Sequence, residues 1–390
     1  MVFDSNRFTS NNVRIMPPSG IRKYFDLAAE RKDIISLSIG EPDFITPDIG
    51  QNAAIRSLLD GHTAYTANSG LLELRQSISE YLTRSYAIDY DPHEEIIITV
   101  GGSEGIDLAL WSLINPGDEV LIPEPCFVSY GPCATLTGGV PVMVPCTMEN
   151  GFKVQIEDLE KSVTDKTKIL LISYPSNPTG VTLVKSDLEK IAAFAIKHDL
   201  VVICDEIYAE VSYGIKHTSL ASLPKMHERT ILISGASKAF AMTGWRIGYA
   251  CAPKDFIDPM LKIHQYILMC APTISQYAAL ACFQYGDHEV EKMLDEYNRR
   301  RLYIIDRFRS MGLDVVDPQG AFYAFPSIKK TGLSSEEFAL RLLNEQGVAV
   351  VPGNAFGQSG EGYIRCSYAA SLDKIATACD RMECFLEKLL

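Results

Sequence analysis

The sequence has no surplus of basic residues and no long apolar run. Its 390 residues include 36 lysines and arginines against 49 aspartates and glutamates, a net charge of −13. An acidic chain attracts nucleic acid and anionic membranes weakly, so neither is an expected partner. No apolar stretch is long enough to cross a bilayer, and the polar N-terminus lacks the apolar core of a signal peptide. We therefore expect a cytoplasmic protein that acts on small molecules.

The sequence also lacks any pair of cysteines separated by two residues, although it contains ten cysteines. Zinc sites and redox-active dithiols are commonly built from such pairs, so neither a metal site nor a redox motif is predicted. The cysteines are scattered, and most lie in apolar surroundings, as Cys204, Cys251 and Cys282 do. Buried, reduced thiols are the natural interpretation.

No internal repeat or low-complexity tract is present, and strand-like apolar runs alternate with helical periodicity. This alternation predicts an α/β fold with a mainly parallel sheet between helices. Two capping boxes, Ser186 with Glu189 and Ser334 with Glu337, predict helix starts. The seven strand-like runs are residues 96–100, 119–122, 140–144, 169–172, 201–204, 231–234 and 247–252.

A long amphipathic segment at 287–311 predicts a helix that links two lobes, and alternating runs at 320–325 and 347–351 predict strands of a smaller sheet. We expect a large domain at 45–285 and a small α/β domain formed by 1–44 together with 286–390.

Lys238 lies in a run of small residues, SGASKAFAMTGWRIGY at 234–249, with Arg246 eight positions later. A desolvated lysine near other cations loses its proton more easily and becomes a nucleophile toward carbonyls. The arginine offers a rigid fork of donors for a phosphate. A carbonyl compound that carries a phosphate fits both groups, and pyridoxal phosphate is the common one. The alternative is a solvated surface lysine and an arginine in an ion pair.

Asp205 follows directly after the apolar run 201–204, at the carboxyl end of the expected strand. Open α/β sheets place their ligand sites at this edge. A carboxylate there can keep a pyridine nitrogen protonated, and Tyr208, three residues later, can donate to the ring oxygen. Alternatively, Asp205 caps a helix and Tyr208 packs in the core.

Two loops after other strands suit the same ligand. The glycine pair at 101–102 and Ser103 precede a helical pattern, so backbone N–H groups and a helix N-terminus can face a phosphate. The loop YPSNPTG at 174–180 carries Asn177, whose amide can donate to the ring oxygen or to a substrate carboxylate. Each loop taken alone is also consistent with an ordinary turn.

Together, these segments resemble the class I and II aminotransferases, which are pyridoxal phosphate enzymes of fold type I with a seven-stranded large domain. The resemblance runs from about residue 20 to the C-terminus. It rests on GGSEGI at 101–106, SNPTG at 176–180, CDEIY at 204–208, SGASK and GWRIG within 234–248, and IRCSYA at 364–369.

The resemblance implies a role for each residue around the cofactor ring. Lys238 forms the internal aldimine and later acts as the base. Asp205 pairs with the pyridine nitrogen, Tyr208 and Asn177 bond the ring oxygen, and Phe127 stacks on the ring.

The resemblance also implies a phosphate site, in which Tyr65 reaches the phosphate of the neighbouring subunit of a homodimer. Many relatives carry a serine at the position of Gly235, so the resemblance does not decide which of residues 234–237 contact the phosphate in this chain. The implied ligands of the phosphate are Gly102, Ser103, Glu104, Ser237 and Arg246.

Substrate binding is assigned by the same resemblance to Gly40, Asn177 and Arg365. A transaminase holds two substrates in turn, and each carries an α-carboxylate that a buried arginine can bind in a bidentate manner. Gly40 allows close approach beside that carboxylate. The alternatives are a surface ion pair for Arg365 and a simple turn for Gly40.

The expected reaction is transfer of an amino group between an aromatic amino acid, or a broad range of amino acids, and a 2-oxo acid such as 2-oxoglutarate. Relatives specific for aspartate carry a cation after the glycine pair, where this chain has Ser103 and Glu104. Ile21, Tyr24 and Phe25 can line an apolar side-chain pocket, or they can be core residues.

Two other reactions remain open: an N-acetyl-diaminopimelate-type transamination and a carbon–sulfur β-lyase reaction, which would use the same lysine. A regulator that senses the cofactor is disfavoured because there is no room for a DNA-binding module before residue 20.

Overall fold

The large sheet has seven strands, and the seven predicted runs supply them. In this computed structural model, which describes residues 5–21 and 33–389, the strand order is β2-β8-β7-β6-β5-β3-β4. Strands β3 to β7 are parallel, and β8 is antiparallel to both of its neighbours. The predicted α/β fold is thereby confirmed. The strands are β2 (Ile96–Thr99), β3 (Glu119–Glu124), β4 (Val140–Pro145), β5 (Thr167–Ser173), β6 (Val201–Asp205), β7 (Thr230–Gly235) and β8 (Gly248–Cys251).

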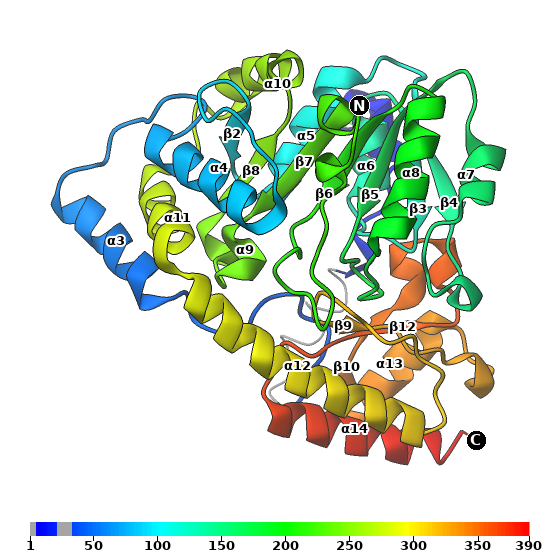
Figure 1. Ribbon diagram of the computed structural model, residues 1–390. Coiled ribbons are helices and arrows are strands. Elements are labelled where there is room, and N and C mark those ends of the chain that lie inside the picture. Colours follow the sequence, from blue (N-terminus) through cyan, green and yellow to red (C-terminus); the bar gives the residue numbers. More distant parts are fainter. Residues whose placement is uncertain (1–4, 22–32, 390) are drawn as a thin grey trace.

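Helices cover both faces of this sheet (Figure 1). Alternate residues of β5 point to opposite faces: Leu170 and Ile172 pack in a cluster with α8, while Ile169 and Leu171 pack in a cluster with α5 and α10. A strand that is buried on both faces has a continuous apolar sequence, and this pattern explains why the positions of the strands could be predicted. The helices are α3 (Asp48–Leu59), α4 (Leu72–Tyr86), α5 (Gly102–Leu113), α6 (Tyr130–Leu136), α7 (Ile156–Ser162), α8 (Lys185–Lys197), α9 (Ala236–Ala239), α10 (Lys254–Ile267) and α11 (Thr273–Tyr285).

One predicted helix start is wrong and the other is confirmed. Helix α8 begins at Lys185, so Ser186 is not its N-cap; instead the Asp187 carboxylate accepts a 3.3 Å bond from the Val184 N–H. Asp187 is held there by an ion pair with Lys153 at 2.7 Å. Helix α13 does begin after Ser334, whose hydroxyl accepts from the Glu337 N–H at 3.2 Å.

A second group of elements packs beside the large sheet, in the lower part of Figure 1. The predicted helix at 287–311 is α12, and it runs from α11 to this group (Figure 1). The N-terminal strand β1 pairs with β10, while β11, β12 and β9 form an antiparallel sheet. These elements are β1 (Ile35–Ser36), α12 (Asp287–Ser310), β9 (Tyr323–Ala324), α13 (Ser335–Gln346), β10 (Val348–Ala349), β11 (Val351–Pro352), β12 (Ile364–Ser367) and α14 (Leu372–Leu386).

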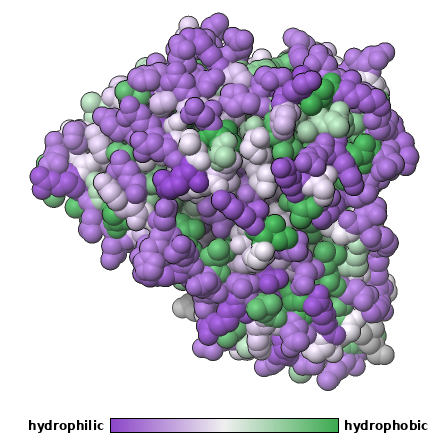
Figure 2. Space-filling model, viewed as in Figure 1, coloured by the Kyte–Doolittle hydropathy of each residue, from purple (hydrophilic) through white to green (hydrophobic). Residues whose placement is uncertain are grey.

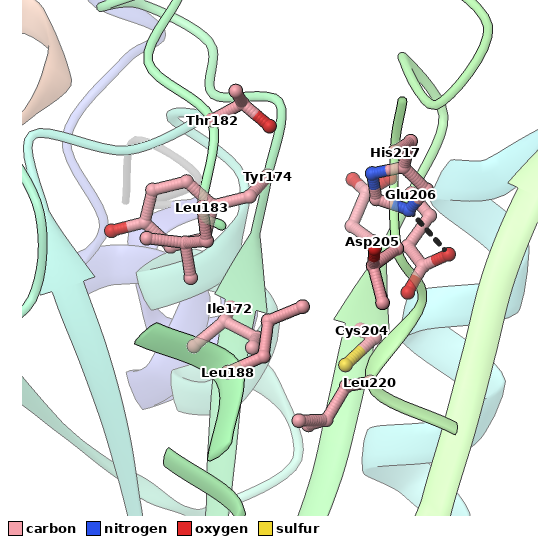
Figure 3. Close-up of a pocket in the computed structure, with 11 residues that line it drawn as sticks. Ile172, Tyr174, Thr182, Leu183, Leu188, Cys204, Asp205, Glu206, His217 and Leu220 are labelled. Carbon is pink, nitrogen blue, oxygen red and sulfur yellow. Dashed lines mark hydrogen bonds and ion pairs between the residues drawn. The ribbon is translucent and has the colours of Figure 1, made fainter. Parts of the chain in front are cut away.

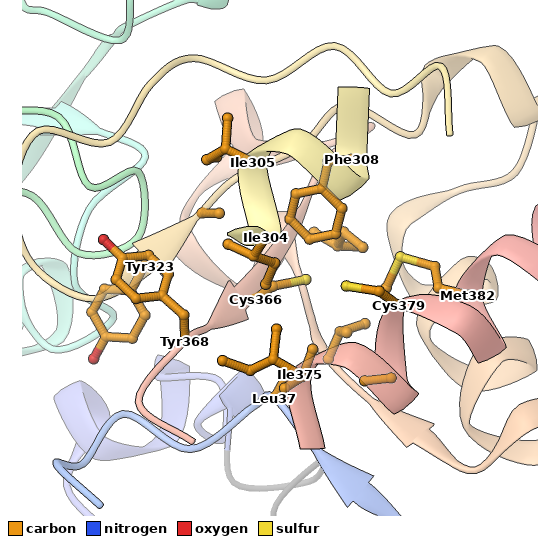
Figure 4. Close-up of a cluster of buried hydrophobic side chains, with 14 of the residues drawn as sticks. Leu37, Ile304, Ile305, Phe308, Tyr323, Cys366, Tyr368, Ile375, Cys379 and Met382 are labelled. Atoms are coloured by element: carbon orange, nitrogen blue, oxygen red, sulfur yellow. The ribbon is translucent and has the colours of Figure 1, made fainter. Parts of the chain in front are cut away.

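The core of this second group joins the N-terminal segment to the C-terminal part of the chain. Leu37 packs with Ile304 and Phe308 of α12, Cys366 of β12 and Met382 of α14 (Figure 4). A smaller sheet beside the large one agrees with the expected small α/β domain; the proposed bounds at 45 and 285 remain a prediction.

The surface visible in Figure 2 is largely hydrophilic. Within residues 5–21 and 33–389, no helix is both long enough and apolar enough to span a membrane. The short elements are α1 (Asn11–Ile15) and the 3-10 turns Ser5–Phe8, Met148–Asn150, Leu220–Ser222, His227–Arg229, Thr243–Trp245, Lys329–Thr331, Gly353–Phe356 and Gln358–Gly360.

Candidate active site

A cavity of about 690 Å³ lies at the carboxyl ends of β5, β6 and β7, and the second group of elements supplies its opposite wall. Ser173 and Asp205 end two of these strands, and Tyr323 and Arg365 come from β9 and β12. Eleven of the predicted site residues line the cavity; Glu104 and Tyr65 are not among the lining residues. The eleven are Gly40, Gly102, Ser103, Phe127, Asn177, Asp205, Tyr208, Ser237, Lys238, Arg246 and Arg365.

Lys238 lies on α9, the short turn of helix that follows β7. Its Nζ donates a 2.7 Å hydrogen bond to the Gly40 carbonyl and lies 5.7 Å from the centre of the Tyr208 ring. Burial lowers the pKa of the amine to about 8; Glu41 opposes this shift, and the cations Arg365 and Arg246 add to it. The neutral form of the amine, which a nucleophile or a base requires, is therefore far more populated near pH 7 than it is for an ordinary lysine.

Gly235 has a steric reason to lack a side chain. A Cβ at this position would lie 2.7 Å from the Gly248 Cα and 2.8 Å from the Ile247 carbonyl oxygen. The two strands approach so closely here that a serine would require β7 or β8 to shift. Ser237, two residues later, does line the cavity.

The lowered pKa of Lys238 gives a pH prediction. In the protein without cofactor, the rate of Lys238 acetylation should rise with pH to a plateau, with a midpoint at about pH 8, since the neutral amine is the reactive form. Mass spectrometry of the modified peptide measures this rate. The denatured chain is the control, in which the midpoint should return toward 10.5. A midpoint in the folded protein equal to that of the denatured chain would contradict the predicted effect of burial.

Asp205 is held in a fixed orientation at the end of β6. One carboxylate oxygen accepts a 2.7 Å bond from the Tyr130 hydroxyl, and the other accepts from the Ile207 N–H at 3.1 Å. Burial raises the pKa of Asp205, while these two bonds counteract the rise. A cation that enters the cavity would stabilise the ionised carboxylate, and a protonated pyridine nitrogen is such a group. Tyr130 was not predicted as a site residue, although it lies three positions after Phe127 in the same motif.

The neighbouring carboxylate, Glu206, points into a different environment and has other partners. It pairs with His217 at 2.9 Å (Figure 3), and it accepts from the Ser219 hydroxyl at 2.8 Å. Glu206 and His217 line a second, water-sized cavity of about 10 Å³, which Asp205 also borders. Of the two adjacent acids, only Asp205 lines the large cavity.

The first turn of α5 and Arg246 form a cradle suited to an anion. Gly101 has φ +77°, and a Cβ there would collide with the Arg246 guanidinium. The guanidinium donates to the Thr243 carbonyl at 3.0 Å and the Val100 carbonyl at 3.4 Å, which fixes it beside the helix N-terminus. Since Gly102, Ser103 and Arg246 all line the cavity, N–H groups, a hydroxyl and a cation converge as a phosphate requires.

The Glu104 side chain turns away from this cradle. Its carboxylate accepts from the Val100 N–H and bonds the Nδ1 of buried His264 at 2.6 Å. A carboxylate beside a phosphate would be repelled, and pairing with His264 keeps it apart. The structure thus does not bring the Glu104 side chain to the predicted cofactor site, and only its backbone remains available.

Arg365 is 2% exposed and keeps a donor free for a ligand. Its guanidinium donates to Asn177 Oδ1 at 2.9 Å and to the Ser38 carbonyl at 2.6 Å. Its Nε has no hydrogen-bond partner within the described part of the chain. A buried, unpartnered N–H beside a cavity favours an anionic ligand, and a substrate carboxylate provides the missing acceptor.

Two tyrosines extend this wall of the cavity. The hydroxyls of Tyr208 and Tyr323 lie 2.7 Å apart, and the Arg365 guanidinium lies 4.4 Å from the centre of the Tyr323 ring. Tyr323 was not predicted from the sequence as a site residue. Ile21 lines the cavity and also belongs to a buried hydrophobic cluster, so it fits both alternatives, whereas Tyr24 and Phe25 lie outside the described residues.

Comparison with known proteins finds aminotransferases that are similar over nearly the whole chain. A family model described as aminotransferase class I and II matches residues 32–382. The YugH protein of Bacillus subtilis (strain 168) is 53% identical over 381 residues, which cover 98% of this chain and 99% of YugH. An aspartate aminotransferase of Pyrococcus abyssi is 49% identical, covering 96% of this chain and 97% of its own. The crystal structure of an aromatic aminotransferase from Pyrococcus horikoshii OT3 superposes with a TM-score of 0.90 at 46% identity, covering 94% of this chain and 100% of that one.

Proposed function

The chain belongs to the class I and II aminotransferases, which use pyridoxal phosphate, and we propose that it transfers amino groups from aromatic amino acids, or a broad range that includes them, to 2-oxoglutarate. One observation carries the site assignment: half-buried Lys238 and the buried Asp205 and Arg365 converge on a single cavity. Each supplies a group that this reaction needs, namely a base, a partner for the ring nitrogen and an anchor for the α-carboxylate.

Bound pyridoxal phosphate supplies an aldehyde for an amine and a conjugated ring that accepts electrons. Asp205, fixed by Tyr130 and the Ile207 N–H, accepts a bond from the protonated ring nitrogen. Tyr208 donates to the ring oxygen. Arg246 and the N-terminus of α5 hold the phosphate.

The substrate is held and deprotonated by two other groups. Arg365 binds the α-carboxylate and thereby fixes the orientation of the Cα–H bond, an effect of positioning. Lys238, whose burial lowers its pKa to about 8, would take the proton from Cα and deliver it to the cofactor carbon that carried the aldehyde. Burial of Arg365 and partial burial of Lys238 limit the access of water to the reacting atoms.

The walls of the cavity support an aromatic or otherwise apolar side chain. Ile21, Ile106, Phe127 and Val128 contribute apolar surface. Among the lining residues within 5–21 and 33–389, the cations are Lys238, Arg246 and Arg365, and each already has a proposed task. A second carboxylate, as in aspartate, would lack a dedicated cation in this part of the chain.

The test of this function is the visible spectrum of the purified enzyme while single amino acids are added. Loss of the visible band with release of the matching 2-oxo acid establishes transamination and ranks the donors. Preference for aspartate over phenylalanine and tyrosine would contradict the proposed substrate class, and preference for N-acetyl-diaminopimelate would replace it. Release of pyruvate and ammonia from cystathionine, while the band persists, would indicate the carbon–sulfur β-lyase alternative.

We further propose that two copies form a homodimer in which Tyr65 completes the neighbouring phosphate site. Tyr65 is 80% exposed and lies outside the cavity of its own chain. Its loop bonds the segment after α10, through Asn68 Nδ2 to the Met269 carbonyl at 2.8 Å. Exposed apolar side chains lie before and on α3, and at the end of α10 and directly after it, as expected of an interface. They are Ile45, Ile55, Leu58 and Leu59 with Tyr266, Ile267, Leu268 and Met269.

Mixed dimers test the role of Tyr65 directly. Tyr65→Ala and Lys238→Ala chains should each be impaired alone. After the two are unfolded, mixed and refolded, they should recover roughly a quarter of wild-type activity, because half of the dimers are mixed and each has one complete site. Sedimentation checks that dimers form. No recovery in dimers shown to be mixed would place Tyr65 in its own chain's site, and a fully active monomer would refute the arrangement.

A further inference from the structure

Tyr323 connects three groups of the proposed site. Its hydroxyl lies 2.7 Å from the Tyr208 hydroxyl. Its ring lies against the Arg365 guanidinium, with 4.4 Å between the ring centre and Arg365 Cζ. A Cβ on Gly40 would approach that hydroxyl to 2.6 Å, so the glycine leaves the space that the hydroxyl occupies. Both tyrosines are buried, and both line the cavity. Tyr323 is therefore held in place from three sides.

The shared hydrogen bond restricts which way the two protons point. A phenol has one donor and two acceptor positions, so one hydroxyl of this pair donates and the other accepts. If Tyr208 donated to Tyr323, its only proton would be engaged and it could not donate to a ligand. If Tyr323 donates, the Tyr208 proton remains available to the cavity.

We propose that Tyr323 is a positioning residue that donates to Tyr208 and so directs the Tyr208 proton toward the ring oxygen of the cofactor. This inference rests on the proposed role of Tyr208 and adds the group that makes this role possible. Tyr323 acts through Tyr208 rather than on the cofactor itself.

The protonation of the pair is compatible with this arrangement. Burial raises the pKa of Tyr208 well above its usual value, and burial also raises the pKa of Tyr323, although Arg365 opposes both shifts. Both hydroxyls keep their protons across the neutral range, so the pair offers two donors. The contact with Arg365 uses the ring face and does not depend on the hydroxyl. A change of tyrosine to phenylalanine therefore separates the two functions of Tyr323.

The experiment is a pH titration of the visible absorbance of the bound cofactor in the holoenzyme. A bond donated to the ring oxygen favours the high-pH form, in which that oxygen carries its full negative charge. Tyr208→Phe should therefore raise the midpoint by about one pH unit, and Tyr323→Phe should raise it by about half a unit. The double variant should equal Tyr208→Phe, because Tyr323 has no effect once its acceptor is gone.

Two controls separate this effect from structural damage. Tyr368→Phe removes another buried hydroxyl, which donates to the Ala321 carbonyl at 3.0 Å, and it should leave the midpoint unchanged. Affinity for 3-phenylpropionate, an unreactive carboxylate, should change less than about twofold in Tyr323→Phe, since the ring under Arg365 is retained.

Placing 3-fluorotyrosine at position 323 keeps the hydroxyl and makes it a stronger donor, so the midpoint should fall. This replacement serves as the test if Tyr323→Phe does not fold.

The outcomes distinguish the two proposals. No shift in Tyr208→Phe would remove the proposed role of Tyr208 itself. A shift in Tyr208→Phe without one in Tyr323→Phe would overturn the inference about Tyr323, and so would additive shifts in the double variant. An unchanged or raised midpoint with 3-fluorotyrosine would overturn it as well.

Discussion

Lys238→Ala is expected to lower turnover at least about 10⁴-fold, because it removes the proposed nucleophile and the proposed base together. The cavity should still bind the cofactor through Arg246, Asp205 and the N-terminus of α5, since these groups do not depend on the lysine. Steady-state kinetics with the best amino donor measures the loss. Borohydride treatment followed by mass spectrometry gives a second measurement: the cofactor should be fixed to Lys238 in the wild type and to no residue in the variant.

Two further variants make the result specific. Lys190→Ala removes an exposed lysine of α8, outside the residues that line the cavity, and should leave both measurements unchanged. Lys238→Arg keeps a positive charge but cannot supply a neutral amine near pH 7, so its activity should be as low as that of the alanine variant. Turnover within tenfold of wild type in Lys238→Ala would remove this residue from the chemistry.

The strands and the residues that follow them were predictable because the signals are local. A run such as 201–204 is apolar and β-branched since it is buried on both faces, and Asp205 stands at the edge where ligands bind. Gly101 of the phosphate cradle is also visible in the sequence, because a side chain there would collide with Arg246. Local patterns and the resemblance to a known family together indicated eleven residues that line one cavity.

The residues that escaped prediction depend on contacts between distant parts of the chain. Tyr130 and Asp205 are 75 positions apart, and Tyr323 and Tyr208 are 115 apart. No local pattern states such distances. A tyrosine in a strand reads as core, and only the fold shows that its hydroxyl meets another in the site.

Ser186 shows how a reasonable local motif can give a wrong helix cap, and Glu104 shows that the position of a residue in a motif does not fix where its side chain lies. Glu104 is at the start of a helix near an anion cradle, but its negative charge is better placed against His264. Ser186 fits a capping pattern, yet Asp187 takes the bond to the helix start because Lys153, from a distant segment, holds it there. In both cases a tertiary partner decides between two locally acceptable arrangements.

Arg365→Lys is the second change with a large expected effect: KM should rise about a hundredfold for the amino acid and for the 2-oxo acid alike. The guanidinium of Arg365 donates to Asn177 and to the Ser38 carbonyl, and its Nε has no partner among the described residues. The single ammonium group of a lysine cannot reach these two acceptors and a substrate carboxylate at the same time. Because both substrates carry the α-carboxylate, both should be affected. Kinetics of each half-reaction, followed by the cofactor spectrum, measures the two effects separately.

A matched substitution shows whether the effect belongs to the site. Arg75 is also buried and bonds the carbonyls of Gly70 and His93 at 3.3 and 3.2 Å, away from the cavity. Arg75→Lys should lower thermal stability and leave both KM values unchanged, since it removes a comparable fork of donors without touching a substrate. A rise for only one substrate in Arg365→Lys would mean that Arg365 recognises a side-chain group. Unchanged KM values for both would leave the α-carboxylate to another donor, and the buried Nε of Arg365 would then need a different ligand.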